Sequence, residues 1–278
     1  MYVLTKRVLL ALAVLVGSVA AAAEFAVPEE TKVRLDRVLE RSGGHLTYFE
    51  GPSEMIGVGI TLQNGQQMVV YATPDGKTVF SGVAVDTDTG ENRTRADLAR
   101  LPEADFGPAF ASIAEALAEG GEGSMVAATE GDRGAEHAFY VFIDPRCPYC
   151  HTLKHAFESV QAKGHDVVVH YIPIGILGPE SQNLASAMAG SPNAEAMAIF
   201  KAARGASSVP AGQDAIAVGA PRAAANLAKF RALSFEAVPA VVSRAGGRYG
   251  ARQGGMSVEM ILSQIGEGED QVARRSGP

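Results

Sequence analysis

The chain has 278 residues, with 24 basic and 31 acidic side chains, and carries a formal charge of −7 at neutral pH. This acidic balance argues against nucleic acid as a partner, because binding to phosphates requires a basic patch. The length suits one large or two ordinary domains. The chain contains 2 cysteines, too few for a disulfide-stabilised scaffold.

Residues 1–23 have the pattern of a secretory signal peptide. Lys6 and Arg7 form its basic start, Val8–Val16 is a short apolar run, and Ala21–Ala23 offers a cleavage site. A membrane anchor is the alternative, but the apolar run is short for a span. Without Lys6 and Arg7, the 24 basic residues become 22 against 31 acidic ones, a charge near −9. We therefore expect a soluble, exported chain.

Residues 24–87 are expected to form a small module of one helix and an antiparallel meander. Helical spacing of apolar residues predicts a helix over Glu29–Arg41. Four short strands are predicted at His45–Phe49, Met55–Leu62, Gln66–Thr73 and Lys77–Val85, separated by turn signals at Asn64-Gly65 and Pro74-Asp75-Gly76. Such a small sheet has exposed edges and little core, so we expect the module to form a homodimer.

Residues 88–133 are polar and rich in alanine and glycine, which is typical of a linker. Apolar residues at helical spacing predict a helix over Pro108–Glu119 within it. We interpret Glu122–Gly134 as a flexible joint. The tail, residues 269–278, is expected to be disordered.

Residues 134–268 alternate between strand and helix patterns. Strands are predicted at Ala138–Ile143, Asp166–Ile172 and Val238–Val242, and Gly246-Gly247 turns the last strand into a hairpin. Helices are predicted at Cys147–Lys163, Ser181–Ala189, Asn193–Arg204, Pro221–Leu233 and Ser257–Ile265. This order resembles a thioredoxin-like domain with a helical insertion.

The two cysteines stand at C-x-x-C spacing where a strand gives way to a helix. One helical turn brings the sulfurs of Cys147 and Cys150 within bonding reach. Unpaired N–H groups and the helix dipole stabilise negative charge on Cys147. Pro148 suits the first turn, where no N–H donor is needed. Thiol–disulfide exchange is therefore predicted, with Cys147 attacking and Cys150 resolving.

Three other readings of the pair stay open from the residues alone. Cys147–His151 also matches C-x-x-C-H, the attachment pattern of haem c. A zinc site would have to include His155, which lies about 12 Å along the helix from Cys147 at 1.5 Å per residue. A structural disulfide closing so small a loop would contribute little stability. We predict no metal and no cofactor. A charged His151 would stabilise the thiolate, whereas a solvated or capping histidine is the plainer alternative.

Val238-Pro239 opens an apolar strand. Proline cannot donate to a strand ladder, so it marks an edge or an unusual peptide bond. An ordinary trans proline at a strand start is the alternative.

Several segments together resemble one family. Phe142-Ile-Asp-Pro-Arg-Cys-Pro-Tyr-Cys150 is similar to the active-site segment of the DsbC/DsbG family of periplasmic thiol:disulfide interchange proteins, and is closest to its DsbG members. Thr73–Lys77, Ser81-Gly82 and Gly90–Asn92 resemble the end of that family's N-terminal module. Ile174–Ser181 and Val238–Ala240 resemble two segments of its catalytic domain, the second being its cis-proline loop.

The resemblance implies a V-shaped homodimer, joined through N-terminal cystatin-like modules, with helical linkers and two thioredoxin-like catalytic domains facing a cleft. It implies that Pro239 is cis beside the cysteines, and that Pro148, Tyr149, Val238 and Pro239 form the substrate-binding surface. Such proteins reduce or isomerise wrong disulfides, or reduce sulfenic acids, on exported proteins. A membrane electron donor of the DsbD type keeps them reduced.

Two residues depart from the family's pattern. Val238 replaces the threonine that usually precedes the cis proline, and valine there is more typical of the oxidase DsbA. Thioredoxin has a buried aspartate six residues before its first catalytic cysteine, a position held here by Val141. The direction of electron flow therefore stays open, with a DsbA-like oxidase as one alternative. A holdase chaperone with secondary redox activity is the other.

Overall fold

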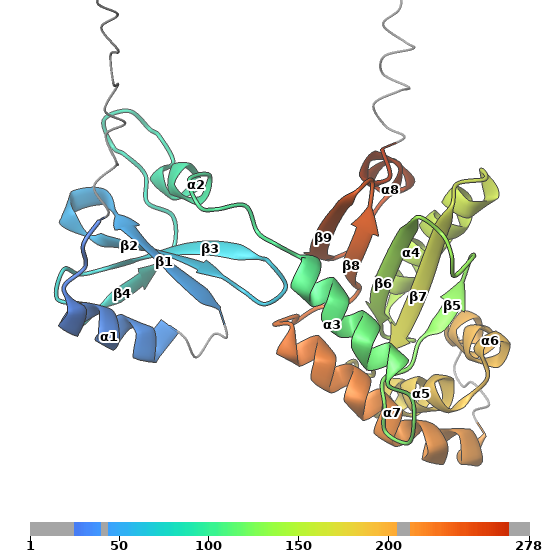
Figure 1. Ribbon diagram of the computed structural model, residues 1–278. Helices are drawn as coiled ribbons and strands as arrows, with labels where there is room; N and C mark the ends of the chain where they lie inside the picture. Colours follow the sequence, from blue (N-terminus) through green and yellow to red (C-terminus); the bar gives the residue numbers. More distant parts are fainter. Residues whose placement is uncertain (1–24, 40–43, 205–211, 267–278) are drawn as a thin grey trace, which may run out of the picture.

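The computed structural model describes residues 25–39, 44–204 and 212–266 (Figure 1). The expected signal peptide at 1–23 and the tail at 269–278 lie outside these residues. The described chain contains a four-stranded sheet followed by a five-stranded sheet. Figure 1 shows the first sheet with α1 on one side of the molecule and the second with the remaining large helices on the other.

The N-terminal sheet is an antiparallel meander with the strand order β1-β2-β3-β4. Its elements are α1 (Glu29–Leu39), β1 (His45–Glu50), the 3-10 turn η2 (Pro52–Glu54), β2 (Ile56–Thr61), β3 (Gln67–Ala72) and β4 (Val79–Ser81). Leu35 of α1 packs on buried residues of β2 and β3, among them Val58 and Val70. The predicted helix and four strands are thus present. The last strand is shorter than predicted, because Gly82 with φ of 148° turns the backbone after Ser81.

A short helix, α2 (Arg93–Leu98), was not predicted. The side chain of Asn92 caps it by accepting a hydrogen bond from the Arg95 N–H at 2.8 Å. The Tyr71 hydroxyl donates to Asp97 at 2.8 Å and ties the helix to β3. Six residues are too few for an apolar period to be recognised in the sequence.

Helix α3 (Gly107–Ala118) agrees with the prediction and packs on the second sheet through Phe110 and Ile113. The interpretation of residues 122–134 as a flexible joint is wrong. This stretch contains β5 (Ala128–Glu130), an edge strand antiparallel to β7. The side chain of Asn226 fixes the approach to β5 by accepting from Val126 N–H at 3.0 Å and donating to Val126 C=O at 3.1 Å.

The second sheet has the order β5-β7-β6-β8-β9, in which only the β6 and β7 pair is parallel. The strands are β6 (His137–Ile143), β7 (Val167–Pro173), β8 (Ala240–Ala245) and β9 (Arg248–Gln253). Helices α4 (Pro148–Ala162), α5 (Pro179–Gly190), α6 (Asn193–Ala203) and α8 (Val258–Gln264) contribute to the core on one face. Helices α3 and α7 (Gln213–Ala232) cover the other face (Figure 1).

Helix α7 begins at Gln213, eight residues before Pro221, the start that the sequence predicts. Proline lacks an N–H and disfavours a helix interior, so packing has overridden the local signal. Helices α5 and α7 approach so closely that a Cβ on Gly219 would lie 1.8 Å from the Ser186 carbonyl oxygen. Glycine at this position therefore permits the contact that holds α7 along α5.

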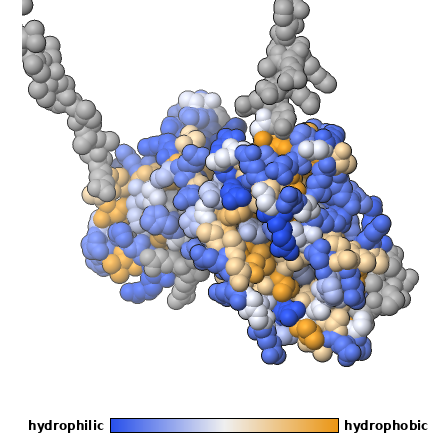
Figure 2. All heavy atoms as spheres, turned by 45° about the vertical axis from the view of Figure 1, so that its right-hand side comes forward, coloured by the Kyte–Doolittle hydropathy of each residue, from blue (hydrophilic) through white to orange (hydrophobic). Residues whose placement is uncertain are grey.

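Figure 2 shows apolar residues in a band across the middle of one face, within a surface that is mostly hydrophilic. In the ranges the structure describes, no helix has the length and hydrophobicity needed to span a bilayer.

Candidate active site

The buried carboxylate of Asp144 organises the loop that carries the cysteines. Asp144 directly follows β6 and is 0% exposed. Its Oδ1 accepts from the Arg146 N–H at 2.8 Å and from the Ser181 hydroxyl at 2.7 Å. Its Oδ2 accepts from the N–H groups of Ile176 and Leu177 at 2.8 and 3.0 Å. One side chain thus connects the end of β6, the loop after β7 and the start of α5.

Cys147 is the N-cap residue of α4, and Cys150 lies within its first turn. The Cys147 carbonyl accepts from the Cys150 N–H at 3.1 Å, and the Cys147 N–H donates to the Asp144 carbonyl at 3.0 Å. Cys147 is 4% exposed and Cys150 is 0% exposed, and both are free thiols. Pro148 and Tyr149 project outward between them, with Tyr149 71% exposed. The pair therefore has an outer sulfur and a fully enclosed inner one.

The two thiols have opposite acid–base character. Hydrogen bonds from the Cys150 thiol and from the N–H groups of Cys150 and Tyr149 lower the pKa of Cys147 to about 6, against the opposing effect of burial. Burial raises the pKa of Cys150 far above its usual range, and the neighbouring Cys147 adds to this effect. At neutral pH the outer sulfur is therefore mainly a thiolate and the inner one a thiol.

His151 is a buried packing residue and not a charged partner of Cys147. Its ring is buried, with Nε2 2.9 Å from the Pro145 carbonyl oxygen, and it stacks on Phe200 with 4.3 Å between ring centroids. Burial lowers the pKa of His151, so the imidazole is neutral at neutral pH. The suggestions that it is a charged partner of the thiolate or a solvated histidine are both wrong, because the ring fills a core position.

Val238 and Pro239 lie beside the cysteines although they are about 90 residues away in sequence. The Val238–Pro239 peptide is cis, as the family resemblance implied. The Cys147 sulfur lies 3.7 Å from the Val238 carbonyl oxygen, to which it donates a hydrogen bond only when the thiol is protonated. Pro239 is buried, and β8 begins only at Ala240. The structure thus brings together, at the N-terminal end of α4, the six site residues expected from the sequence: Cys147, Pro148, Tyr149, Cys150, Val238 and Pro239.

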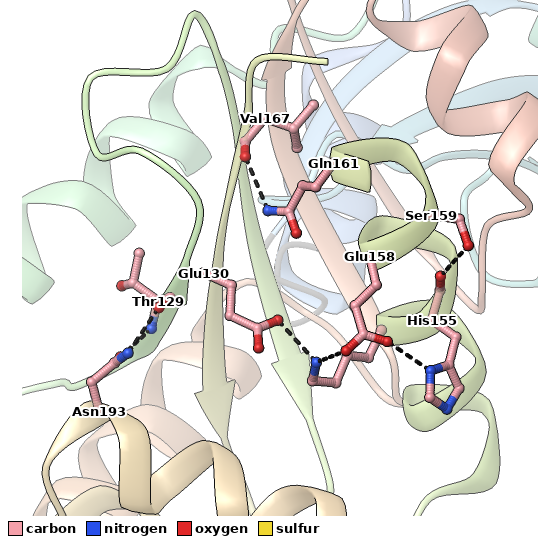
Figure 3. A network of polar contacts seen from close by, with 9 residues as sticks. Thr129, Glu130, His155, Glu158, Ser159, Gln161, Val167 and Asn193 are labelled. Carbon is pink, nitrogen blue, oxygen red and sulfur yellow. Dashed lines mark hydrogen bonds and ion pairs between the residues drawn. The ribbon is translucent and has the colours of Figure 1, made fainter. Parts of the chain in front are cut away.

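A charged network lies further along α4. Figure 3 shows Glu130 of β5 and Glu158 of α4 pointing toward one ammonium group. This group belongs to the buried Lys154, whose Nζ is 3.0 Å from Glu130 Oε2 and 2.6 Å from Glu158 Oε1. His155 contacts Glu158 at 2.7 Å. Within the described part of the chain, no group of three or more His, Cys, Asp or Glu side chains could hold a metal ion.

A cavity of about 940 Å³ lies where the N-terminal sheet meets the second domain. Leu62, Gln66 and Met68 line it from the β2–β3 hairpin, and residues of α7, the loop after it, β9 and the loop after β7 line the other side. Glu236 and Gln253 are among the latter. The cavity therefore borders the loop that leads into Val238-Pro239.

Comparison with known proteins places this arrangement in a family. Residues 126–268, about half of the chain, match the model of the thioredoxin-like domain. The chain belongs to the thioredoxin-like family. Its described N-terminal sheet lies outside the matched region, which begins just before β5.

Parts of the chain are also similar to a curated protein and to solved structures. The chain is 30% identical over 160 residues to the thiol:disulfide interchange protein DsbG of Pseudomonas aeruginosa, a match that spans 58% of each chain. The solved catalytic domain of Proteus mirabilis ScsC is 20% identical, with 59% of this chain and 97% of that chain covered and a TM-score of 0.39. Pseudomonas aeruginosa DsbA2 is 17% identical, with 54% and 96% covered and a TM-score of 0.43.

Sequence reasoning missed two residues of this thioredoxin-like site. Asp144 had a signal, because an aspartate before a proline at the end of an apolar strand favours a turn stabilised by its side chain. Gln253 had none. It ends β9, and its Oε1 accepts from the N–H groups of Glu236 and Ala237, both at 2.7 Å. Its place in the site depends on the tertiary fold.

Proposed function

We propose that the chain is a thiol–disulfide oxidoreductase of the Dsb type that reduces or isomerises disulfides of exported proteins in the periplasm. The observation that carries this proposal is the asymmetry of the cysteine pair. Cys147 has a pKa lowered to about 6 and lies 3.7 Å from the Val238 carbonyl, whereas Cys150 is enclosed and protonated. The similarity to DsbG over 160 residues supports the same chemistry.

In the proposed reaction, the Cys147 thiolate attacks one sulfur of a substrate disulfide. A bond between Cys147 and the substrate forms as the substrate S–S bond breaks, and the leaving thiolate takes up a proton. Cys150 then loses its proton and attacks Cys147 Sγ, which releases the second substrate thiol. The substrate gains two electrons and two protons, and the enzyme pair becomes a disulfide. In isomerisation, another substrate thiol attacks the mixed disulfide instead, so net oxidation does not change.

Formation of the mixed disulfide itself activates Cys150. The negative charge and hydrogen bonding of Cys147 contribute to the raised pKa of Cys150. Once Cys147 is bonded to the substrate, this charge is gone and Cys150 loses a proton more easily. This effect offsets the absence of a carboxylate at Val141. Pro148, Tyr149, Val238 and Pro239 would bind the substrate around the sulfur, with an extended segment pairing along the backbone next to Pro239.

A homodimer through the N-terminal module, which we interpret as cystatin-like, completes the proposal. The sheet order leaves β1 and β4 as edge strands. Phe80 on β4 is 51% exposed, and Val83 and Val85 just beyond it are also exposed. A second copy that covers this apolar edge would remove it from water. A membrane dithiol donor of the DsbD type would return the oxidised pair to its reduced state.

A DsbA-like oxidase is the second candidate. It is favoured by Val238, because valine before the cis proline is more typical of the oxidase DsbA. The reduction potential of the Cys147–Cys150 pair separates the alternatives. A value near the roughly −270 mV of thioredoxin supports a reductase, whereas a strongly oxidising value supports an isomerase or oxidase. Isomerase and oxidase then differ in whether the reduced protein rearranges a scrambled disulfide substrate.

The proposed function is tested by trapping the mixed disulfide. Cys150→Ala removes the resolving thiol. Exported proteins that are substrates should therefore remain disulfide-bonded to Cys147 and be identified by mass spectrometry. The matched variant Cys147→Ala should recover none. Absence of adducts from Cys150→Ala would overturn the proposal. Suppression of aggregation that persists when both cysteines are replaced would instead indicate a holdase.

A further inference from the structure

The loop that leads into the cis proline is held by one side chain. Glu236 and Ala237 lie directly before Val238, and both of their N–H groups donate to Gln253 Oε1 at 2.7 Å. On the other side of the proline, the Gly254 N–H donates to the Pro239 carbonyl at 2.8 Å. The end of β9 therefore fixes this loop from both sides, and with it the carbonyl that contacts Cys147.

The same side chain reaches the N-terminal module. Gln253 Nε2 donates to Gln66 Oε1 at 3.3 Å. This oxygen also accepts from Asn64 Nδ2 at 3.1 Å, and Asn64 is 0% exposed. Asn64 Nδ2 lies within 3.4 Å of the Ser234 carbonyl, two residues before Glu236. A continuous set of side-chain amides thus runs from the β2–β3 turn to the loop beside the catalytic sulfur.

The contacts of Gln253 affect the orientation of the loop before Val238 more than the stability of the fold. Glu236 and Ala237 are exposed, so water can replace Gln253 as the partner of their N–H groups at small cost. Water would not hold the two groups in one direction. The Val238 backbone, with which an extended substrate would pair, would then sample more orientations relative to Cys147.

We propose that Gln253 is a positioning residue for the substrate-binding loop, and that it couples this loop to the N-terminal module through Gln66. The inference rests on the proposed function, because the loop binds substrate only if Cys147 performs exchange. The substrate class affected is an extended polypeptide that carries a disulfide. A small disulfide needs contact with Cys147 but no pairing along the loop.

The test compares two disulfides, insulin and oxidised glutathione, with the full chain. Gln253→Met removes all three side-chain hydrogen bonds of Gln253 at similar side-chain length, and should raise KM for insulin about tenfold. The rate with oxidised glutathione should stay within about twofold of wild type. Gln161→Met is the matched control, since Gln161 donates to the Val167 carbonyl at 3.1 Å away from the loop. It should leave KM for insulin unchanged.

Coupling to the module is tested by a double-mutant cycle. Gln253→Glu keeps an acceptor for the two loop N–H groups but loses the donor to Gln66, and it serves as the second variant where Gln253→Met folds poorly. Gln66→Met removes the acceptor of the same bond. Each should raise KM for insulin about threefold, and the double variant should add little to Gln66→Met, because both changes delete the same bond between Gln253 and Gln66. The bond from Asn64 to Gln66 is lost in Gln66→Met and in the double variant alike, so it cancels in the cycle.

The outcomes distinguish the positioning role of Gln253, its coupling to the N-terminal module and the proposed function. An unchanged KM for insulin in Gln253→Met, or an equal loss with oxidised glutathione, would overturn the positioning role. Fully additive effects in the double variant would overturn the coupling. A wild-type protein that reduces neither disulfide would overturn the proposed function, and this inference with it.

Discussion

The sulfur of Cys147 lies 3.7 Å from the carbonyl oxygen of Val238, which is 91 residues further along the chain. This contact places the outer thiol directly beside the backbone of the cis-proline loop. An extended chain that pairs with this backbone would present a disulfide to Cys147 without rearrangement of the protein. Positions of the loop and the sulfur are therefore linked, and each has its own supporting residue, Gln253 for the loop and Asp144 for the cysteine turn.

Replacement of Asp144 tests its support of the cysteine turn. In Asp144→Asn the new NH₂ group faces N–H donors, so the free energy of unfolding should fall by about 2 kcal/mol. The negative charge of Asp144 also raises the pKa of Cys147, so its removal should shift the pH profile of Cys147 alkylation to lower pH.

Ser181→Ala is the control for Asp144→Asn. It removes one hydrogen bond to the carboxylate but keeps the charge, so stability should fall by about 1 kcal/mol with no shift of the profile. Identical alkylation midpoints in Asp144→Asn and wild type would show that the charge does not reach Cys147.

His151→Phe tests whether the neighbouring histidine tunes the nucleophile. Phenylalanine keeps the stacking on Phe200 but leaves the Pro145 carbonyl without its partner. Denaturant unfolding should show a loss of about 1–2 kcal/mol. The Cys147 alkylation midpoint should stay in place, because a neutral imidazole contributes no charge. A rise of the midpoint by a full pH unit would mean that His151 is charged in the folded protein.

Lys154→Met tests the network of Figure 3. The substitution leaves the carboxylates of Glu130 and Glu158 without their shared cation. Both carboxylates are partly exposed, so the loss of unfolding free energy should lie between surface and buried pairs, at about 2 kcal/mol. Lys163→Met, at the exposed end of the same helix, should change stability by less than about 0.5 kcal/mol. Equal effects of the two substitutions would rule out a special role for the buried ammonium.

Local patterns predicted most elements, because alternating apolar runs and glycine turns act over a few residues. The helix that follows Cys147 was predicted over Cys147–Lys163 and occurs over Pro148–Ala162. The start of α7 was not predicted, because the close contact that Gly219 makes with α5 overrides Pro221. Strand β5 was missed for a related reason, since three residues of an edge strand carry no period and depend on pairing with β7.

In the candidate site, too, some residues can be predicted from the sequence and others are shown only by the tertiary fold. Cys147 and Cys150 were identifiable from spacing alone, and the proximity of Val238 and Pro239 came from the family resemblance. Gln253 could not be found, because a glutamine at a strand end has no distinctive pattern. The buried state of His151 depends on Phe200, which lies on a helix far along the chain.

The most direct test of this account is the pH dependence of alkylation at each cysteine. The reduced protein is treated with iodoacetamide from pH 4 to 10, and labelled peptides are quantified by mass spectrometry. Because the pKa of Cys147 is lowered to about 6, its labelling rate should rise through pH 6 and level off above pH 7. Cys150 should remain unlabelled across the range. A Cys147 midpoint near the ordinary thiol value of about 8.5, or equal labelling of Cys150, would contradict the account.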